Sequence, residues 1–584
     1  MYRKSPTSTE PDLFRSFSQN LSGARYSKFS DTSHWHNVFR EQIVTRIDEE
    51  PFRCLYSEDN GSPNASIRVL LGMMILKEGF GWSDSRLFEE AEFNILVMSG
   101  LGLMNMDDQA ACPATYYNFR QALFNHQVST GEDLIGNVFK GLTKEQAKFF
   151  GVNGKFTRMD SKLIGSNICK SSRLQLIINV LQVFYKDIKK KASLSAQQAG
   201  LTSRLTPEDL QTLEGLLKKN AGNQVYEMDN EERANKIEAL GYLMYRLQEL
   251  YNEAESEKYH LLPRVLSEQY HIEGGKVILR KVEEIKSDSL QSPYDEDAAY
   301  RKKGEGGDAQ KVQGYSINVT ETCNAGELNL ITDTKVEKAN YTDKDFLPDA
   351  IERSQQVVGP IEHVNADGAY HSEGNHEFAK ANETELILSG MPGREGNYIF
   401  EITDEQHVMV TNTQTGEVQQ AELSRQRKHS TGEPAYRIKE NGKLRYFTRA
   451  AIHVWQQGQI IRQTPRSERN RRNNVEATIF QLSYFTRKNK TRYRNRIKHQ
   501  WWADFRCSWL NLIRIKNWMG EVCPDENKNG ESQRIALKNG EFVTNTVVFC
   551  IKRTLRSIWL FVERIVEGIF SATLLGTLPI KRPK

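Results

Sequence analysis

Three short acidic segments constrain the fold of this chain most strongly, because they lie far apart in the sequence and each has a distinct local context. They are Arg158-Met-Asp160-Ser-Lys-Leu-Ile-Gly-Ser-Asn-Ile168, Asn365-Ala-Asp367-Gly-Ala-Tyr370-His-Ser-Glu-Gly-Asn375 and Arg471-Arg472-Asn-Asn-Val-Glu476-Ala. A fold that brings together Asp160, Asp367 and Glu476 would create a set of carboxylates able to hold two divalent metal ions. Two such ions can drive phosphodiester chemistry.

Local patterns predict a different element for each acid. Residues 155–162 alternate in character, which predicts a strand that carries Asp160. Asp367 follows the short apolar stretch 360–364, a predicted strand, and Glu476 lies in a predicted helix. Because the chain has 75 acidic residues, spacing alone would select many such triples. An isolated acid is usually a solvated surface residue, so the residues that flank these three carry the weight of the hypothesis.

Length and composition indicate a globular chain of several domains. A chain of 584 residues is too long for one ordinary core, which predicts two to four domains. Its 38% hydrophobic and 26% charged residues are typical of a soluble globular protein. The net charge of +4 is small against 79 basic and 75 acidic residues, so only local charge is informative about partners.

Cysteine usage and the chain's start predict a reduced cytoplasm. The seven cysteines are scattered and form no Cys-x-x-Cys pair, which argues against both a disulfide framework and a zinc ribbon. No apolar stretch typical of a secretion signal follows Met1. The most apolar stretch, residues 558–578, contains Glu563, Arg564 and Glu567, charges that would be costly inside a bilayer.

Residues 1–150 are predicted to form a helical N-terminal domain. Residues 67–76 form an apolar helix that Gly79 and Gly81 are expected to end, Ser83 is a candidate N-cap, and Pro113 begins a further helix. A compact run of short helices is typical of DNA-binding heads, but equally of bundles that bind nothing.

Two insertions are predicted between the acids. Helical spacing of Leu174, Ile177 and Leu181 opens a helical block over residues 174–286. Residues 312–319 and 328–332 predict two paired strands. Residues 384–457 predict a β-rich insertion, in which Asn441-Gly442 is a strong hairpin signal.

A basic, aromatic-rich segment surrounds and follows Glu476. Twelve Lys and Arg residues lie between Arg462 and Lys498, opposed by Glu468 and Glu476 only. Lys and Arg contacts to phosphate dominate DNA affinity, and aromatic side chains can stack on unpaired bases. The alternative is a solvated basic helix with buried aromatic side chains. The candidate DNA-binding residues are Arg472, Arg487, Lys488, Lys490, Arg492 and Tyr493.

The tail beyond residue 545 predicts a helix, with Ile558, Val562, Ile565 and Ile569 on one face. That face is more typical of ordinary core than of a dimer seam. His371 and His453 are assigned no role, because lone histidines are most often structural.

In their order and flanking residues, these segments resemble those of DDE transposases from bacterial insertion sequences. The likeness covers residues 35–518. Its motifs are Asp160-Ser161 with Ser166-Asn167-Ile168, Asp297, Lys311 with Gly314-Tyr315, Asp367-Gly368 with Tyr370, Arg472 with Glu476, and the N-terminal stretches 84–90 and 115–120. Each motif is weak by itself, but together and in this order they are strong.

The resemblance implies a mixed α/β fold, namely an RNase H-like catalytic domain over residues 151–518 with a C-terminal tail over 519–584. It implies that Asp160, Asp367 and Glu476 are catalytic and bind two Mg²⁺ ions, with Mn²⁺ as an alternative. It further implies cleavage at element ends, followed by attack of the freed 3′-hydroxyl on target DNA. The implied partners are double-stranded DNA of the terminal inverted repeats and of the target, and a second copy of the chain in the DNA complex. The implied location is the bacterial cytoplasm, at the nucleoid when DNA is bound.

One departure and two alternatives accompany this resemblance. Related transposases with a Tyr-Arg-Glu-Lys motif often place Lys seven residues after the Glu, where this chain has Ser483. Lys488 or Lys490 is the candidate substitute, and no Tyr precedes Arg472 at the matching position. The alternative functions are an RNase H-like metal nuclease without strand transfer and a DNA-binding protein that has lost catalysis.

Overall fold

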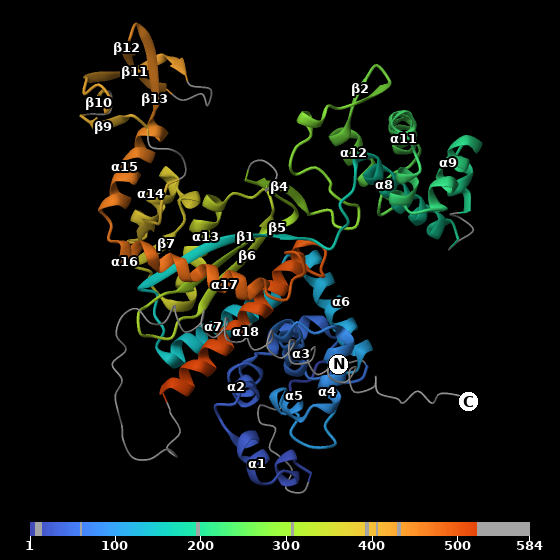
Figure 1. Ribbon diagram of the computed structural model, residues 1–584. Coiled ribbons are helices and arrows are strands. Elements are labelled where there is room, and N and C mark those ends of the chain that lie inside the picture. Colours follow the sequence, from blue (N-terminus) through green and yellow to red (C-terminus); the bar gives the residue numbers. More distant parts are fainter. Residues whose placement is uncertain are drawn as a thin grey trace, which may run out of the picture. The chain divides into compact units, whose positions relative to one another are not determined.

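The computed structural model describes residues 1–5, 15–58, 61–193, 199–304, 309–391, 396–403, 407–428 and 434–522 (Figure 1). All described residues belong to one compact unit. The helix predicted beyond residue 545 lies outside the described residues.

A six-stranded mixed sheet forms the centre of this unit. Its strands are β1 (Phe156–Gly165), β4 (Ala299–Lys303), β5 (Gln310–Thr322), β6 (Ile331–Lys338), β7 (His363–Ala366) and β8 (Glu385–Leu388). β1 lies between an antiparallel β5 and a parallel β7, and β8 continues parallel to β7. The far edge of β5 pairs antiparallel with β4 and β6. The mixed α/β class and the strand that carries Asp160 are thereby confirmed, and the second predicted strand begins at Ile331, not at residue 328.

Close approach of β1 and β5 requires a glycine at position 314. A Cβ there would overlap the carbonyl oxygen of Ile164 and lie 2.7 Å from the backbone nitrogen of Ser166. We expect Gly314→Ala to lower the free energy of unfolding by about 1–3 kcal/mol, since neither backbone group can give way without breaking the pairing. Urea denaturation measures the loss. Gly141→Ala is the control, because a Cβ at that helical position meets no atom within 4 Å; equal stability of the two variants would contradict the prediction.

The N-terminal region is helical, as predicted. Its elements are η1 (Phe17–Asn20), α1 (Gly23–Ser30), α2 (Trp35–Gln42), η2 (Val44–Arg46), η3 (Glu50–Leu55), α3 (Ile67–Phe80), α4 (Asp84–Phe93), α5 (Ile95–Gly100), α6 (Pro113–Thr130) and α7 (Leu134–Phe150). Ser83 caps α4, and Gly81 ends α3 with a φ of +70°. Gly79, predicted to help end this helix, instead lies inside it, where its missing side chain makes room for the ring of Trp509.

The helices α13 (Asp343–Val358), α17 (Asn473–Ser483) and α18 (Arg496–Val522) pack against the sheet, and α18 also joins it to the N-terminal helices. The shorter elements between them are η6 (Gly368–Tyr370), α14 (Glu373–Ala381), α16 (Arg466–Arg469) and η7 (Asn470–Arg472). α18 contacts β6 as well as α2, α3 and α7. Trp501, Phe505 and Trp509 of α18 share one hydrophobic core with α3, so this helix attaches the N-terminal region to the sheet.

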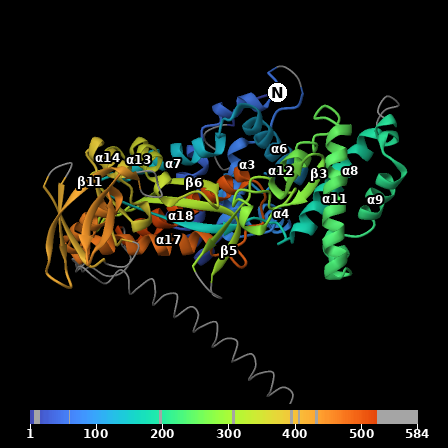
Figure 2. The same ribbon diagram turned by 90° about the horizontal axis from the view of Figure 1, so that it is seen from above.

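The predicted helical block forms its own core. It contains α8 (Arg173–Ala192), η4 (Ala199–Arg204), α9 (Pro207–Leu217), α10 (Ala221–Tyr226), α11 (Asn230–Leu250), α12 (Leu261–Gln269), the hairpin of β2 (Tyr270–Glu273) and β3 (Lys276–Leu279), and η5 (Val282–Glu284). Figure 2 shows α11 and α8 in this block; the two helices are in contact, and Phe184, Leu243 and Met244 belong to their common core.

The predicted β-rich insertion is a separate antiparallel sheet. Its elements are β9 (Tyr398–Ile402), β10 (His407–Asn412), β11 (Val418–Lys428), β12 (Pro434–Glu440), β13 (Lys443–Thr448) and the helix α15 (Arg449–Gln463). The Asn441-Gly442 hairpin is confirmed, with φ values of +50° and +78° that suit a tight two-residue turn. The insertion begins after residue 388, because residues 385–388 form β8 of the central sheet.

Within the described residues, no helix has the length and apolar character needed to cross a membrane.

Candidate active site

The three predicted acids converge on one guanidinium group. Nη2 of Arg472 lies 3.0 Å from Oδ2 of Asp160, 3.4 Å from Oδ2 of Asp367 and 3.7 Å from Oε1 of Glu476. No two of these oxygens can therefore be farther apart than twice 3.7 Å. Residues separated by hundreds of positions in the sequence thus form one cluster.

Sheet register and one helix explain this convergence. The parallel pairing of Arg158 with Asn365 brings Asp160, two residues further along β1, next to the end of β7, where the chain continues into Asp367. Asp367 directly follows the last residue of β7. α17 packs against β1 and brings Glu476 to the same edge (Figure 1). The predicted strand, strand-end and helix positions are confirmed for the three acids.

The three carboxylates differ in burial. The side chain of Asp160 is 14% exposed, that of Asp367 45% and that of Glu476 63%. Burial raises the pKa of Asp160 above its ordinary value, although Arg472 and the backbone N–H of Ser161 act in the opposite direction. Asp160 is therefore the floor of the cluster, and Glu476 lies at its solvent side.

A buried ion network beneath the acids was not foreseen from the sequence. Glu321 on β5 is fully buried and accepts hydrogen bonds from Arg158 and Arg514, each at 2.6 Å, and from the hydroxyl of Thr478 at 2.8 Å. Arg158 also donates to the backbone carbonyl of Arg471 at 3.0 Å. The network thereby joins β5, β1, α17 and α18. The available signal was a Glu inside the strand segment 310–322, whose later residues are otherwise apolar or neutral.

The donor chemistry of the acid cluster fits a hard divalent cation, because all three groups offer carboxylate oxygens. As the side chains stand, however, no three His, Cys, Asp or Glu residues in the described part of the chain are arranged to hold a metal ion. At the acid cluster, the guanidinium of Arg472 lies among the carboxylate oxygens and takes the place that a metal ion would need. A metal ion would therefore require this side chain to withdraw.

Lys162, in the first acidic segment, contacts Ser483. This is the position at which related transposases with a Tyr-Arg-Glu-Lys motif have a lysine. Nζ of Lys162 donates to Oγ of Ser483 at 2.7 Å. Lys162 lies two residues after Asp160 on β1, so both side chains belong to the same face of the strand. Burial lowers the pKa of this lysine, and no carboxylate lies within ion-pairing distance of it among the described residues. Lys162 is therefore the lysine that contacts position 483, where the sequence predicts Lys488 or Lys490 as the substitute.

Gly165 and Asn167 dock the basic segment onto the end of β1. The N–H of Gly165 donates to the carbonyl of Asn489 at 2.7 Å, and the N–H of Thr491 donates back to Gly165 at 3.0 Å. Asn167 donates its N–H to the carbonyl of Tyr493 at 2.8 Å. The loop that follows α17 is therefore anchored by its backbone at the end of β1.

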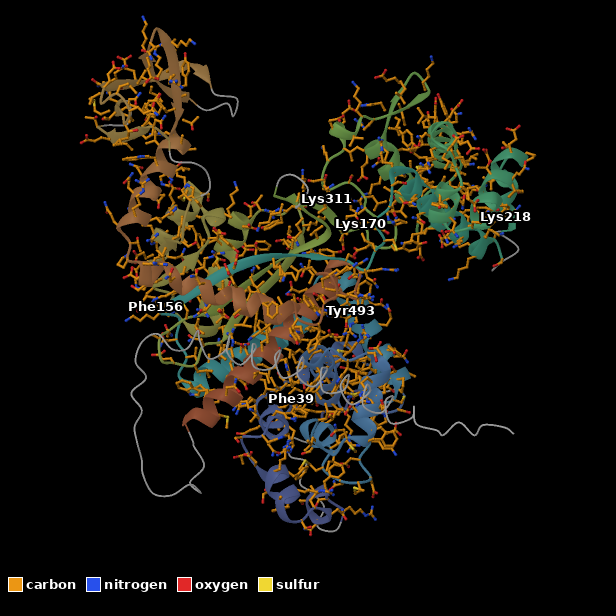
Figure 3. All side chains as sticks on the ribbon, viewed as in Figure 1. Phe39, Phe156, Lys170, Lys218, Lys311 and Tyr493 are labelled. Carbon is orange, nitrogen blue, oxygen red and sulfur yellow. The ribbon has the colours of Figure 1, made fainter. Side chains whose placement is uncertain are left out.

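The six predicted DNA-binding residues lie in three places, the first being Arg472 among the acids. Arg487, Lys488, Lys490 and Arg492 line a pocket of about 570 Å³, together with Phe485. Tyr493 instead points inward, between α18 and the N-terminal helices (Figure 3), where its hydroxyl donates to Glu78. Its ring packs against the core that contains Ile164 and Trp502.

His371 and His453, to which the sequence assigns no role, lie together with a third histidine, His376. The ring centroids of His371, His376 and His453 are 5.2–5.4 Å apart, and Nδ1 of His371 lies 3.1 Å from Nε2 of His376. Burial, then the neighbouring His371 and His453, lowers the pKa of His376 to about 4. This cluster joins the segment after Asp367 to α15.

The fold and the site define a chain with a helical N-terminal region and a central sheet that gathers three carboxylates. Residues 26–122 match the family model described as Transposase domain (DUF772), which covers most of the predicted N-terminal helical domain. No curated protein and no solved structure matches the chain. The family match supports a transposase of an insertion sequence, and hence DNA as the partner.

Proposed function

We propose that this chain is a DDE transposase that cleaves DNA at the ends of an insertion sequence and transfers those ends to target DNA. The observation that carries the proposal is the convergence of Asp160, Asp367 and Glu476 around one guanidinium nitrogen. A random triple of acids would not be expected to meet at one sheet edge, and the N-terminal family match independently points to transposition.

The strand order supports an RNase H-like catalytic core. β1 is central, β5 and β6 continue antiparallel on one side, and β7 and β8 continue parallel on the other. The first acid lies on the central strand, the second directly after the parallel neighbour, and the third on a following helix. This is the arrangement that the resemblance to DDE transposases implies.

The residues of the site would have different roles in DNA cleavage. Asp160, Asp367 and Glu476 would hold Mg²⁺, which supplies Lewis-acid stabilisation of charge on the reacting phosphate. Arg472, which donates to Asp160, and Lys162, two residues after Asp160 on β1, provide cationic groups suited to bind the phosphates that flank the scissile bond. The Glu321 network holds the backbone before Arg472 in place.

A direct test uses the DNA that flanks the coding sequence of the chain. Linear duplexes that carry both flanks are incubated with the protein in Mg²⁺ or in EDTA, and nicking and joining to a supercoiled plasmid are followed on gels. The proposal predicts Mg²⁺-dependent nicking at defined positions and joined products. Nicking without joining would indicate the metal nuclease, and binding without nicking the inactive DNA-binding protein.

The position of Arg472 leads to a prediction that does not depend on turnover. Removing an opposite charge within hydrogen-bonding distance changes the electrostatic free energy of a carboxylate by the equivalent of one or more pKa units. We therefore expect Arg472→Ala to bind Mn²⁺ about 10-fold more tightly in the absence of DNA. Isothermal titration calorimetry measures the affinity. Arg472→Lys, which keeps the charge, should resemble the wild type; identical affinities in all three proteins would contradict a metal site among these acids.

A further inference from the structure

The solvent face of α17 carries an unusual row of exposed aromatic side chains. Val475, Ile479 and Leu482 are buried and hold the opposite face of this helix to the core. Phe480 and Tyr484 are each 60% exposed. They follow Glu476 at intervals of four residues, so all three side chains lie in one stripe along the helix.

This stripe begins at the proposed catalytic acid. With a rise of 1.5 Å per residue, Phe480 and Tyr484 lie about 6 and 12 Å along the helix axis from Glu476. The ring centroids of Phe480 and Tyr484 are 5.9 Å apart, and those of Tyr484 and Phe485 are 5.1 Å apart. The three rings therefore form a row in edge-to-face contact, which begins about one helical turn from Glu476. We call Phe480, Tyr484 and Phe485 the aromatic platform.

The far end of the platform is fixed in place. The ring of Phe485 packs against Gly81, where a Cβ would overlap it. The guanidinium of Arg506 lies 5.1 Å from the centre of the same ring, and this arginine is held by the carbonyls of Glu78 and Gly79 at 2.8 Å. A ring with two fixed neighbours loses little conformational entropy when a ligand stacks on it.

Cationic side chains adjoin the platform. Phe485 lines the same pocket as Arg487, Lys488, Lys490 and Arg492. Glu78, which also lines this pocket, already accepts the hydroxyl hydrogen of Tyr493. A ligand that suits both surfaces must combine flat apolar faces with negative charge.

We propose that the aromatic platform binds unpaired nucleobases of a DNA strand whose phosphates contact the adjoining basic pocket. In a duplex the faces of the bases are covered by their neighbours, so the rings can stack only where the strand is unpaired. The inference rests on the proposed transposase function. It adds that the DNA next to the scissile phosphate is held with bases out of the helix, so that local unpairing precedes or accompanies cleavage.

The test compares two DNA probes by fluorescence anisotropy. One probe is a single-stranded oligo(dT), and the other is the same length of oligo(dT) paired with oligo(dA). We expect Phe480→Ala and Tyr484→Ala each to weaken binding of the single strand by about 5- to 100-fold, the range measured for loss of one base–aromatic stack. Duplex binding should change less than about twofold, because phosphate contacts dominate it. Tyr484→Phe keeps the ring and should bind both probes as the wild type does.

Matched controls separate stacking from general loss of exposed apolar surface. Phe149 is 62% exposed and lies on the N-terminal helix α7, so Phe149→Ala should leave both affinities unchanged. Equal losses for single strand and duplex, or no loss for either, would overturn the platform. A concentration-dependent oligomer of the wild type that Phe480→Ala dissolves would also overturn it, because the occupant would then be a second copy of the chain.

Different results would reject the aromatic platform and the proposed transposase function. Metal-dependent nicking by the wild type together with unchanged single-strand binding by the variants would reject the platform alone. Absence of nicking in the wild type, whatever the variants bind, would reject the transposase function.

Discussion

Asp160→Asn is expected to lower the rate of Mg²⁺-dependent DNA nicking by about 1000-fold or more. The carboxylate of Asp160 is the most buried of the three and lies on the central strand, where no other described acid replaces it. Loss of a metal-ligating group removes several kcal/mol of transition-state stabilisation, and each 1.36 kcal/mol is a factor of ten in rate. The rate is measured on the flanking-DNA duplex with excess enzyme.

The Asp160→Asn protein must still bind the DNA duplex if its lower nicking rate is to be assigned to catalysis. Asparagine keeps the shape of the side chain and can still accept from Arg472, so affinity for the duplex in EDTA should stay within about threefold of the wild type. Glu373→Gln is the matched control, since this exposed carboxylate on α14 lies close to Asp367 in sequence but outside the cluster. Full nicking by Asp160→Asn, or an equal loss in Glu373→Gln, would remove Asp160 from the catalytic set.

Glu321→Ala is expected to lower the free energy of unfolding by about 3–5 kcal/mol, because it leaves the partly buried guanidinium groups of Arg158 and Arg514 without their carboxylate. Chemical denaturation measures this loss. Glu352→Ala, an exposed change on α13, should stay within about 0.5 kcal/mol of the wild type. A Glu321→Ala protein as stable as this control would show that the network does not hold the fold together.

The same residue predicts the direction of a pH effect. Burial alone would raise the pKa of Glu321, but the charges of Arg514 and Arg158 outweigh burial, and the net pKa is lowered from 4.5. A carboxylate with a lowered pKa in the folded state stabilises the fold above its unfolded pKa and ceases to do so as pH falls through the folded value. The stability of the wild type should therefore decline below about pH 4.5 more steeply than that of Glu321→Gln, which has no such group to titrate.

Sequence patterns predicted most local elements of this protein. The strand that carries Asp160, the Ser83 cap, the start of α6 at Pro113 and the Asn441-Gly442 hairpin depend on residues adjacent in the chain, and all are present. The choice of the three acids also depended on local flanking motifs, and the structure brings these three side chains together. Gly79 was misassigned because its role comes from Trp509, which is distant in sequence.

Tertiary structure alone decided which side chains surround the three acids. The pairing of β1 with β7 and the packing of α17 place Arg472 among the three carboxylates. The same contacts between distant segments bring Lys162 to Ser483 and Glu321 between two arginines. The same packing turned Tyr493 inward and left Phe480 and Tyr484 exposed, although all three belong to one aromatic-rich segment. Short-range preferences in the sequence determine which residues lie in a helix, a strand or a turn. Which of them meet depends on contacts between strands and helices that no local pattern encodes.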